Sequence, residues 1–311
     1  MDQFIWVEKY RPQTVAACIL PVAIKTTAMS FVAQGDLPNM ILSGGPGMGK
    51  TTLALAMCRE LGCTTLFING SEESGIDVLR TKIRDFASSL SLDGKRKYVI
   101  LDEADYLNQN STQPALRGLM EEFAINCGFI LTCNYSNRII KELHSRCVGI
   151  SFAVPADEKK ALMLQTLERL VTICAAESVR ADEAILVQVV KRWWPDIRRM
   201  INEVQRACAD GELTPAVLGK SADVQFGPLW LALMSRNYRG AREWIGEHAD
   251  IDPPKFYRTV FEWLHEHAEE STLPTLIILL ADYQYKHLNA VDSHVHLAAF
   301  CLEMMHNGKF K

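Results

Sequence analysis

The sequence predicts an α/β domain with a parallel sheet, followed by a small helical domain and an all-α C-terminal domain. Up to residue 152, short apolar runs alternate with helical patterns, the order that βαβ units and a parallel sheet produce. Beyond Pro155, long amphipathic patterns replace the strand signals. Glycines and prolines mark a linker at 213–228. We therefore expect domains at 1–152, 153–222 and 223–311.

The expected strands are "MILSG" (40–44), "TLFING" (65–70), "YVILDEAD" (98–105), "FILTCN" (129–134) and "VGISF" (148–152). Helical patterns at 52–61, 78–90 and 114–124 separate them. The next helix is expected at 156–174, where an acidic first turn suits a helix N-terminus. Helical patterns continue to about Gly219, and again over 229–311 with breaks at 250–255 and 271–274.

The composition is that of a soluble globular protein, with 48% hydrophobic and 23% charged positions among 311 residues. The start, "MDQFIWVEKYRP", lacks the basic region and apolar core of a secretory signal. The longest uncharged apolar run, "LPTLIILLA" (273–281), is far shorter than the ~18 residues that a bilayer span needs. We expect a cytoplasmic protein without a membrane partner.

Cysteine spacing and net charge exclude two further classes. None of the nine cysteines forms a CxxC pair, so neither a thiolate zinc site nor a disulfide framework is expected, only reduced and mostly buried thiols. The net charge of −4 argues against a protein that coats nucleic acid through bulk charge. Two basic clusters, "RTKIR" (80–84) and "KRK" (95–97), fit either a local basic surface or a solvated helix face or loop.

A phosphate-binding loop is predicted directly after the first strand. "GGPGMGKT" fits the pattern G-x-x-x-x-G-K-[ST] and opens a helix, the context that a P-loop requires. Backbone N–H groups and the helix N-terminus favour phosphate there, Lys50 would reach the β- and γ-phosphates, and Thr51 would hold Mg²⁺. We expect ATP to contact Gly44, Gly45, Pro46, Gly47, Met48, Gly49, Lys50, Thr51 and Thr52.

Two later strands end in polar residues that suit phosphate chemistry. Asp102 and Glu103 end an apolar strand expected beside the P-loop strand; Asp102 is assigned to the metal and Glu103 to orienting and activating water. Alternatively, both acids simply favour a helix N-terminus. Asn134 ends the next strand, where it would bond the γ-phosphate or the water, or else serve only as a turn residue.

The motifs together resemble the ATPase subunits of sliding-clamp loaders, which belong to the AAA+ class. The resemblance rests on "VEKYRP", "LPNMILSGGPGMGKTT", "NGSEESGIDVLRTKIRDFA", "ILDEADYLNQNSTQPALRGLMEEF", "CNYSNRIIKELHSRC" and "PDIRRMINEV". It is specific over about residues 5 to 205, where the chain is similar to the small subunits of replication factor C. The chain length, "WPDIRR" and the helical tail look most similar to the large subunits of phage clamp loaders.

The resemblance implies that the second domain is a lid and the third a collar. ATP binding would assemble subunits into a hetero-oligomeric, pentameric spiral that holds a sliding clamp open, and hydrolysis on primer-template DNA would release the closed ring. Arg198 matches the lid arginine that contacts nucleotide on its own subunit; by itself the Arg198–Arg199 pair would pass as a solvated helix face. The residues implied to line the adenine pocket are Val7, Tyr10, Arg11 and Pro12.

The resemblance also implies contacts with the DNA backbone and a route from DNA to the catalytic acid. Arg80 matches a position that contacts phosphate, which requires no base reading. Ser74 replaces a basic residue that is common in the family, which predicts a weaker grip at that point. Gln113 matches a glutamine thought to couple DNA binding to the catalytic acid, next to the unusual Pro114 and Gly118.

Arg146, within "SRC", is predicted to act outside its own chain. It lies between two strands and should project from the rim of the sheet, toward the γ-phosphate held by a neighbouring subunit. A guanidinium there stabilises charge on the transferred phosphoryl group, with effects of about 10³ to 10⁵ in rate. A salt bridge within the chain is the simpler alternative.

Two other functions stay open. A different AAA+ DNA motor, for branch migration or helicase loading, would share the P-loop and the acidic pair but not the "SRC" and "GIDVLRTKIRDFA" blocks. A scaffold subunit of a clamp loader would typically lack the P-loop lysine or the acid, and this chain carries both Lys50 and Glu103.

Overall fold

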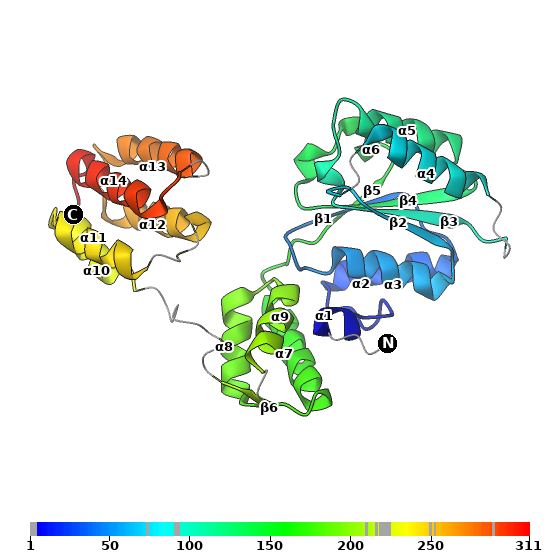
Figure 1. Ribbon diagram of the computed structural model, residues 1–311, viewed down its shortest axis with the longest axis horizontal. Coiled ribbons are helices and arrows are strands. Elements are labelled where there is room, and N and C mark those ends of the chain that lie inside the picture. Colours follow the sequence, from blue (N-terminus) through cyan, green and yellow to red (C-terminus); the bar gives the residue numbers. More distant parts are fainter. Residues whose placement is uncertain are drawn as a thin grey trace. The chain divides into compact units, whose positions relative to one another are not determined.

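The computed structural model describes residues 5–72, 75–89, 94–208, 211–214, 217, 225–248, 251, 253–287 and 290–311, apart from the side chain of Val78. The chain divides into two compact units, Met1–Gly219 and Lys220–Lys311 (Figure 1). The domain boundary predicted after residue 222 lies outside the described residues, as does Ser74.

The first unit is built on a five-stranded parallel sheet with the strand order β2-β3-β4-β1-β5 (Figure 1). Its strands are β1 (Met40–Ser43), β2 (Thr65–Asn69), β3 (Lys97–Asp102), β4 (Cys127–Cys133) and β5 (Val148–Ser151). The prediction of a parallel α/β sheet is confirmed. One detail was wrong: β3, which carries Asp102, does not lie beside β1, because β4 pairs with both strands and separates them.

Helices cover both faces of the sheet. On one face lie α2 (Val22–Gln34) and α3 (Lys50–Leu61), and on the other α4 (Ile76–Ser88), α5 (Thr112–Glu122) and the short α6 (Lys141–His144) (Figure 1). Alternate residues of β1 serve the two layers, with Met40 and Leu42 packing toward α2 and α3 and Ile41 toward α4 and α5. Both faces are buried, so the strands read as continuous apolar runs.

The small helical part of the first unit consists of α7 (Lys159–Ala176), α8 (Glu183–Trp193) and α9 (Ile197–Ala207). Asp182 and Asp196 cap the starts of α8 and α9 with their side chains. Two short strands that the sequence did not signal, β6 (Arg180–Ala181) and β7 (Glu212–Leu213), pair in parallel. Because Leu213 and Val217 are buried in this core, the predicted linker at 213–228 begins too early.

The N-terminal helix α1 (Trp6–Lys9) packs with this helical part, although the sheet follows it in sequence. Trp6 is buried in the core of α7, α8 and α9, and its backbone N–H donates to Gln205 Oε1 at 2.9 Å. Two 3-10 turns, η1 (Ala104–Tyr106) and η2 (Ser136–Arg138), follow β3 and β4 and complete the described elements of this unit.

The second unit is all helical, as predicted. It contains α10 (Gly227–Met234), α11 (Tyr238–Glu247), α12 (Pro253–His267), α13 (Leu273–His287) and α14 (Ser293–Asn307). Stacked and edge-on aromatic rings fill its core, among them Trp230 on Trp263 and Phe256 on Phe300. Within the described residues, no helix has the length and apolar character needed to span a bilayer.

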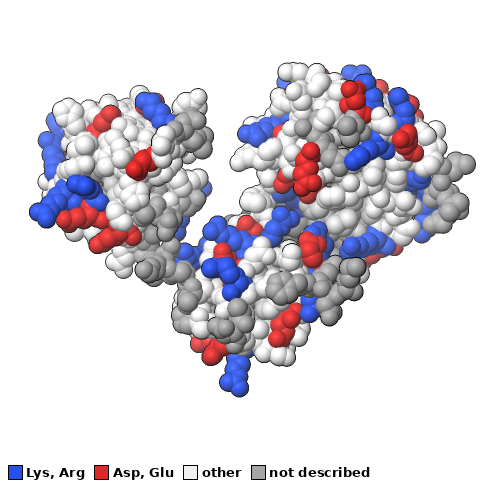
Figure 2. Space-filling model, viewed as in Figure 1, with Lys and Arg blue, Asp and Glu red and all other residues white. Residues whose placement is uncertain are grey.

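Charge is mixed over the surface. Figure 2 shows Lys and Arg interspersed with Asp and Glu on the visible face of each unit. In the "KRK" cluster Lys95 is exposed and Lys97 is buried, and all three cations bind backbone carbonyls. Lys95 donates to Leu61 O at the end of α3, and Lys97 to Phe86 O near the end of α4. Arg96 donates to Leu37 O and Ala124 O.

Candidate active site

A pocket opens at the carboxyl edge of the sheet, where the loops after β1, β3 and β4 meet α9 and the N-terminal segment. It holds about 1050 Å³ of empty space, open solvent included, which reaches the upper end of the ~300–1,000 Å³ usual for small-molecule sites. The structure brings these predicted residues together in its lining: Val7, Tyr10, Arg11, Pro12, Pro46, Gly47, Met48, Gly49, Lys50, Thr51, Thr52, Asp102, Glu103, Asn134 and Arg198.

Lys50, the first residue of α3, follows directly after the predicted phosphate-binding loop. It is 7% exposed, and its ammonium donates to the carbonyl oxygens of Gly44 and Gly45, both at 2.7 Å, and to Asn134 Oδ1 at 2.9 Å. Burial lowers the pKa of Lys50 below its ordinary value, and the charge of Arg198 acts in the same direction. Phosphate oxygens could replace these acceptors without leaving the ammonium unsatisfied.

Asp102 joins three elements at one point. Its Oδ1 accepts hydrogen bonds from Thr51 Oγ1 and Thr132 Oγ1, each at 2.6 Å. Thr132 lies on β4, the strand between β1 and β3, so the intervening strand completes this network instead of blocking it. A threonine hydroxyl beside a carboxylate supplies the oxygen donors that Mg²⁺ prefers, and the donor set therefore fits the expected metal.

Glu103 has a backbone conformation that turns the chain sharply after β3. Its φ of 53° and ψ of 43° lie in the left-handed region, which non-glycine residues rarely adopt. The N–H of Glu103 donates to Thr132 Oγ1 at 3.2 Å, and its side chain lines the pocket without capping η1. The absence of such a cap, within the described part of the chain, argues against the alternative that this acid only starts a helix.

Asp105 is a buried residue that the sequence did not single out. Its Oδ2 accepts from the backbone N–H groups of Asn134 and Tyr135, at 3.2 and 3.1 Å, while Oδ1 has no hydrogen-bond partner among the described residues. This carboxylate ties the turn after β3 to the end of β4. Asp105 follows Glu103 by two residues and binds the N–H of Asn134, so it connects the segment that carries Glu103 to the segment that carries Asn134.

Helix α9 begins next to the predicted phosphate-binding loop. The N–H of Ile197 donates to Gly47 O at 3.2 Å. Gly47 has a φ of 67°, and a Cβ atom at this residue would meet Asp196 Oδ1 at 1.7 Å. Only glycine therefore fits between the loop and the helix cap. Arg198, one residue further, lines the pocket.

The pocket lining also contains residues that the sequence did not predict. Apolar groups of Cys18, Ile19, Leu20 and Ile201 line it together with Val7, and Arg169 reaches it from α7. Cys133 also lines the pocket, and burial raises the pKa of its thiol to about 11. A single arginine in a helix otherwise read as amphipathic gives no sequence signal of this placement, because only the fold brings α7 to the N-terminal segment.

Five predicted residues are not part of the pocket lining. Gly44 and Gly45 contribute carbonyl oxygens to Lys50 instead, and the other three lie further away. The guanidinium of Arg146 donates from Nε to Glu121 Oε1 at 2.9 Å and forms an exposed ion pair with that carboxylate. Gln113 is fully buried and bridges two segments, because its Nε2 donates to Leu107 O and Arg138 O and its Oε1 accepts from Ile140 N–H. Arg80 is exposed on α4.

Comparison with known proteins identifies the two parts of the first unit. A model described as "ATPase family associated with various cellular activities (AAA)" matches residues 40–154. The model for the sliding-clamp-loader large subunit, AAA+ ATPase lid domain, matches residues 158–219. The chain is 39% identical over 219 residues to the sliding-clamp-loader large subunit of Enterobacteria phage T4, which covers 70% of this chain and 68% of that protein. It belongs to the sliding-clamp-loader ATPases.

This clamp-loader ATPase also has cellular relatives. It is 31% identical over 317 residues to the replication factor C small subunit of Thermofilum pendens, covering 96% of this chain and 95% of that protein. The RuvB Holliday junction branch migration motor of Thermotoga maritima superposes with a TM-score of 0.53 over 84% of this chain and 80% of that one. Its sequence identity of 17% shows a common fold alone. The chain is an ATP hydrolase of the clamp-loader family.

Proposed function

We propose that this chain opens a sliding clamp when it binds ATP, engages primer-template DNA, and releases the closed clamp when it hydrolyses ATP. The observation that carries the proposal is that Lys50, Thr51, Asp102, Glu103 and Asn134 line one pocket, which also includes residues of a lid of the clamp-loader type. Lys50 and Glu103 are both present in that pocket, which argues against a scaffold subunit without turnover.

The phosphate end of the pocket supports in-line transfer of the γ-phosphoryl group to water. Lys50 would exchange its carbonyl acceptors for β- and γ-phosphate oxygens, while the P-loop N–H groups cradle the phosphates. Thr51 and Asp102 would hold Mg²⁺. When bound, that ion neutralises charge that develops on the phosphoryl oxygens. Both ligand side chains already share one hydrogen bond, so little rearrangement is needed.

Glu103 and Asn134 are the residues proposed to handle the attacking water. Glu103 would orient the water and accept its proton, a contribution of typically ~10² to 10⁴ in rate for a general base. Asn134 Oδ1 accepts from Lys50 Nζ, and its amide would bond the γ-phosphate or the water. Arg198 would contact the same phosphate from the lid. These four side chains enter from the AAA core and the lid, so closure of the lid completes the site.

Arg146 is proposed to act on ATP bound to a neighbouring subunit. It lies outside the pocket of its own chain, and its partner Glu121 has a side chain that is 50% exposed. An ion pair at such an exposed position is weak, because water competes for both charges. A phosphate of the neighbour could therefore displace Glu121, and the arginine would change partner on assembly. The pair within the chain is compatible with this role.

Arg80 and Gln113 are proposed to connect DNA to catalysis. Arg80 is exposed and makes no hydrogen bond or ion pair with the described residues, which leaves its guanidinium available to a DNA phosphate. Gln113 lies near the start of α5, where it ties the segment after Glu103 to the segment after Asn134. Movement of α5 on DNA binding would reach both catalytic segments through this one side chain.

Measurement of ATP hydrolysis tests the proposal. The chain alone should hydrolyse ATP slowly, and the cognate clamp, partner subunit and primer-template DNA together should accelerate it many-fold. Lys50→Ala supplies the background under the same conditions. A rate that stays flat when all three are added contradicts clamp loading.

A branch-migration motor is the competing DNA function, and the RuvB likeness supports only its fold. The match of residues 158–219 to a clamp-loader lid favours loading. Stimulation by four-way junctions without a clamp would reverse that preference.

A further inference from the structure

Helix α7 of the lid and Glu177, the residue that follows it, hold both ends of the segment Lys9–Cys18, which we name the strap. At one end, Lys9 Nζ and Tyr10 Oη both donate to Glu177 Oε1, each at 2.7 Å. At the other, Arg169 donates from its guanidinium to Ala17 O at 2.7 Å. Glu177 directly follows the last residue of α7, and Arg169 lies two turns earlier. The two ends of the strap are therefore attached to one helix and the residue after it.

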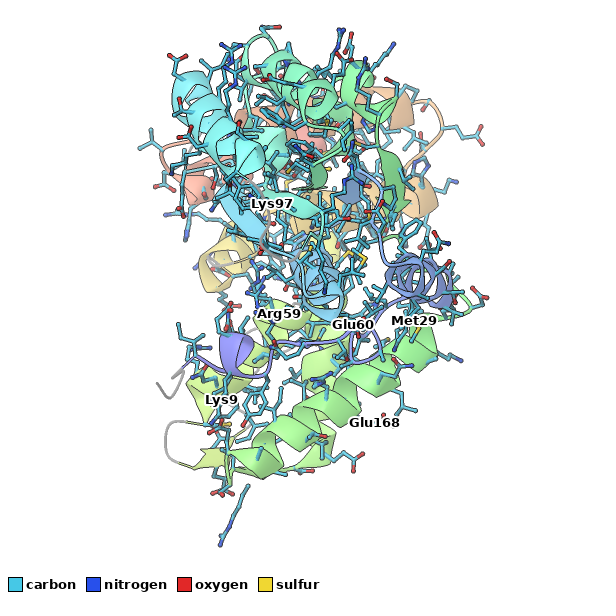
Figure 3. All side chains as sticks on the ribbon, turned by 90° about the vertical axis from the view of Figure 1, so that its right-hand side faces the viewer. Lys9, Met29, Arg59, Glu60, Lys97 and Glu168 are labelled. Carbon is cyan, nitrogen blue, oxygen red and sulfur yellow. The ribbon has the colours of Figure 1, made fainter. Side chains whose placement is uncertain are left out.

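The opposite side of the strap contacts α3, the helix that starts with Lys50. Glu60 Oε1 accepts from Val15 N–H at 3.2 Å, and Arg59 donates to Gln13 Oε1. Figure 3 shows Lys9 beside α7, and Arg59 and Glu60 on the side of α3 that faces the strap. The strap thus lies between the P-loop helix and the lid, and it can transmit a shift of one to the other.

The strap borders the end of the pocket that suits a nucleotide base. Lys50 and Thr51 mark the phosphate end. The remaining lining by the strap and its neighbours is mostly apolar, from Val7, Pro12, Ile19, Leu20 and Ile201. A flat aromatic base with few charges fits such a lining better than phosphate does. Tyr10, whose ring lines this end, is the strap residue that both faces the pocket and bonds to the lid.

We propose that Glu177 is a positioning residue for base binding: it fixes Tyr10 against the base and makes the base end of the site depend on the position of the lid. Arg169 anchors the other end of the strap for the same purpose. The inference rests on ATP binding in this pocket, as in the proposed function, but requires neither clamp nor DNA. Glu177 touches no nucleotide in this account and acts through Tyr10.

The chemistry of the Tyr10–Glu177 contact explains why the effect should be large. Tyr10 is half-buried, and burial raises the pKa of its hydroxyl, which therefore stays protonated and donates. The hydrogen bonds from Lys9 and Tyr10 lower the pKa of Glu177, so the acceptor stays ionised at neutral pH. A hydrogen bond to a charged group is among the stronger ones in proteins. Its loss releases the Tyr10 ring from the lid and is expected to weaken ATP binding about tenfold.

The test compares ATP with inorganic tripolyphosphate, which occupies the phosphate end but has no base. Calorimetric titration of the full chain with Mg²⁺ and each ligand gives both dissociation constants. Glu177→Ala should raise the constant for ATP about tenfold, and should leave the constant for tripolyphosphate and the kcat at saturating ATP unchanged. Glu177→Gln keeps an acceptor oxygen and should recover part of the affinity.

Two further variants keep the test decisive. Tyr10→Phe retains the ring but not the hydroxyl, and should weaken ATP binding as Glu177→Ala does, with no additional loss in the double variant. Glu168→Ala is the matched control, because Glu168 lies on the same helix at an exposed position (Figure 3). Equal weakening of ATP and tripolyphosphate, or unchanged ATP binding in both Glu177→Ala and Tyr10→Phe, overturns the proposal. Failure of wild-type chain to bind ATP would instead reject the proposed function.

Discussion

Ionic side chains lie in two regions of the first unit: the pocket at the carboxyl edge of the sheet and the surface around Arg146, which we call the rim. The two regions differ in how far these side chains are buried and in what pairs with them. In the pocket, Lys50 is 7% exposed and its ammonium has three acceptors within the chain. At the rim, Arg146 is 31% exposed and its carboxylate partner Glu121 is 50% exposed. Arg80, on α4, is exposed and has no partner among the described residues.

The difference follows from the cost of an unpaired charge. A buried ion must be paired inside the chain, because an uncompensated buried charge is very unfavourable. An exposed ion pair is easily exchanged, because solvent screens both partners. The charged groups of the pocket are therefore already paired without a ligand, whereas those of the rim can exchange one partner for another. This is compatible with the proposed division between residues that act on the chain's own nucleotide and residues that act on another molecule.

The largest effect on the ATPase rate is expected from a substitution at the rim that leaves the pocket unchanged. Arg146→Ala should lower clamp- and DNA-stimulated ATPase by about 10³ to 10⁵, while ATP binding to the isolated chain stays unchanged. Mixing Arg146→Ala with Lys50→Ala chains should restore part of the rate, because some interfaces then join an intact arginine to an intact P-loop. Steady-state hydrolysis of defined mixtures measures this.

Glu121 offers the matched control for that experiment. Glu121→Gln removes the ion pair within the chain but keeps the guanidinium, so the stimulated rate should stay close to that of the wild type. If Glu121→Gln is as damaging as Arg146→Ala, the salt bridge within the chain is what matters. The in-trans role would also be refuted if mixtures shown to contain both chains recover no activity.

The next largest effect is expected from a substitution within the pocket that leaves the rim unchanged. Glu103→Gln should lower kcat by ~10² to 10⁴, the range for loss of a general base, because an amide cannot accept the proton of the attacking water. ATP affinity should be retained, since Lys50 and the P-loop hold the phosphates. Single-turnover hydrolysis and equilibrium titration separate the two quantities. Loss of ATP binding would refute the role assigned to Glu103.

A smaller effect is expected from the carboxylate that links two catalytic segments. Asp105→Ala leaves the N–H groups of Asn134 and Tyr135 without their acceptor, and should lower kcat by roughly 10- to 100-fold, from the ~1–3 kcal/mol cost of unsatisfied buried groups. Asp105→Asn should be mild, because the amide oxygen can accept both bonds. Comparison of kcat and KM for the two variants checks this; equal losses would show that charge, not the acceptor, is required.

The smallest effect concerns the exposed arginine of α4. Arg80→Ala should weaken primer-template binding only a few-fold and reduce the salt slope of binding by about one. ATP hydrolysis without DNA should not change, because Arg80 lies outside the pocket. Titration of labelled DNA at several salt concentrations gives the slope. An unchanged slope would remove Arg80 from the DNA interface.

The grouping of the proposed phosphate-site residues in one pocket was predictable because the signals are local. A P-loop is contiguous in sequence, and parallel strands bring their carboxyl ends to one edge, so Asp102 and Asn134 could be placed near Lys50 from strand patterns alone. The all-α second unit was predictable for the same reason, from helical periodicity. The error about β3 and β1 shows the limit: strand patterns identify strands but not their order in the sheet.

Other contributions depend on partners far away in sequence. Glu177 meets Tyr10 across 167 positions, and Arg169 meets Ala17 across 152. Asp105 belongs to the quoted "DEAD" run, yet its contacts with Asn134 and Tyr135 depend on how two loops turn. The "KRK" cluster could not be interpreted locally, because the helix ends that these cations bind come from other segments.

By itself, the sequence predicted the strands of the large sheet, most helices, the P-loop pattern and the acids that follow it, all of which depend on neighbouring residues. The tertiary structure alone decided which strand separates β1 from β3, that α7 and Glu177 hold the strap, and that Arg146 pairs with Glu121 outside the lining of its own pocket. Such facts depend on loop paths and packing between distant segments, where burial and hydrogen bonding of whole elements, not local patterns, select the arrangement.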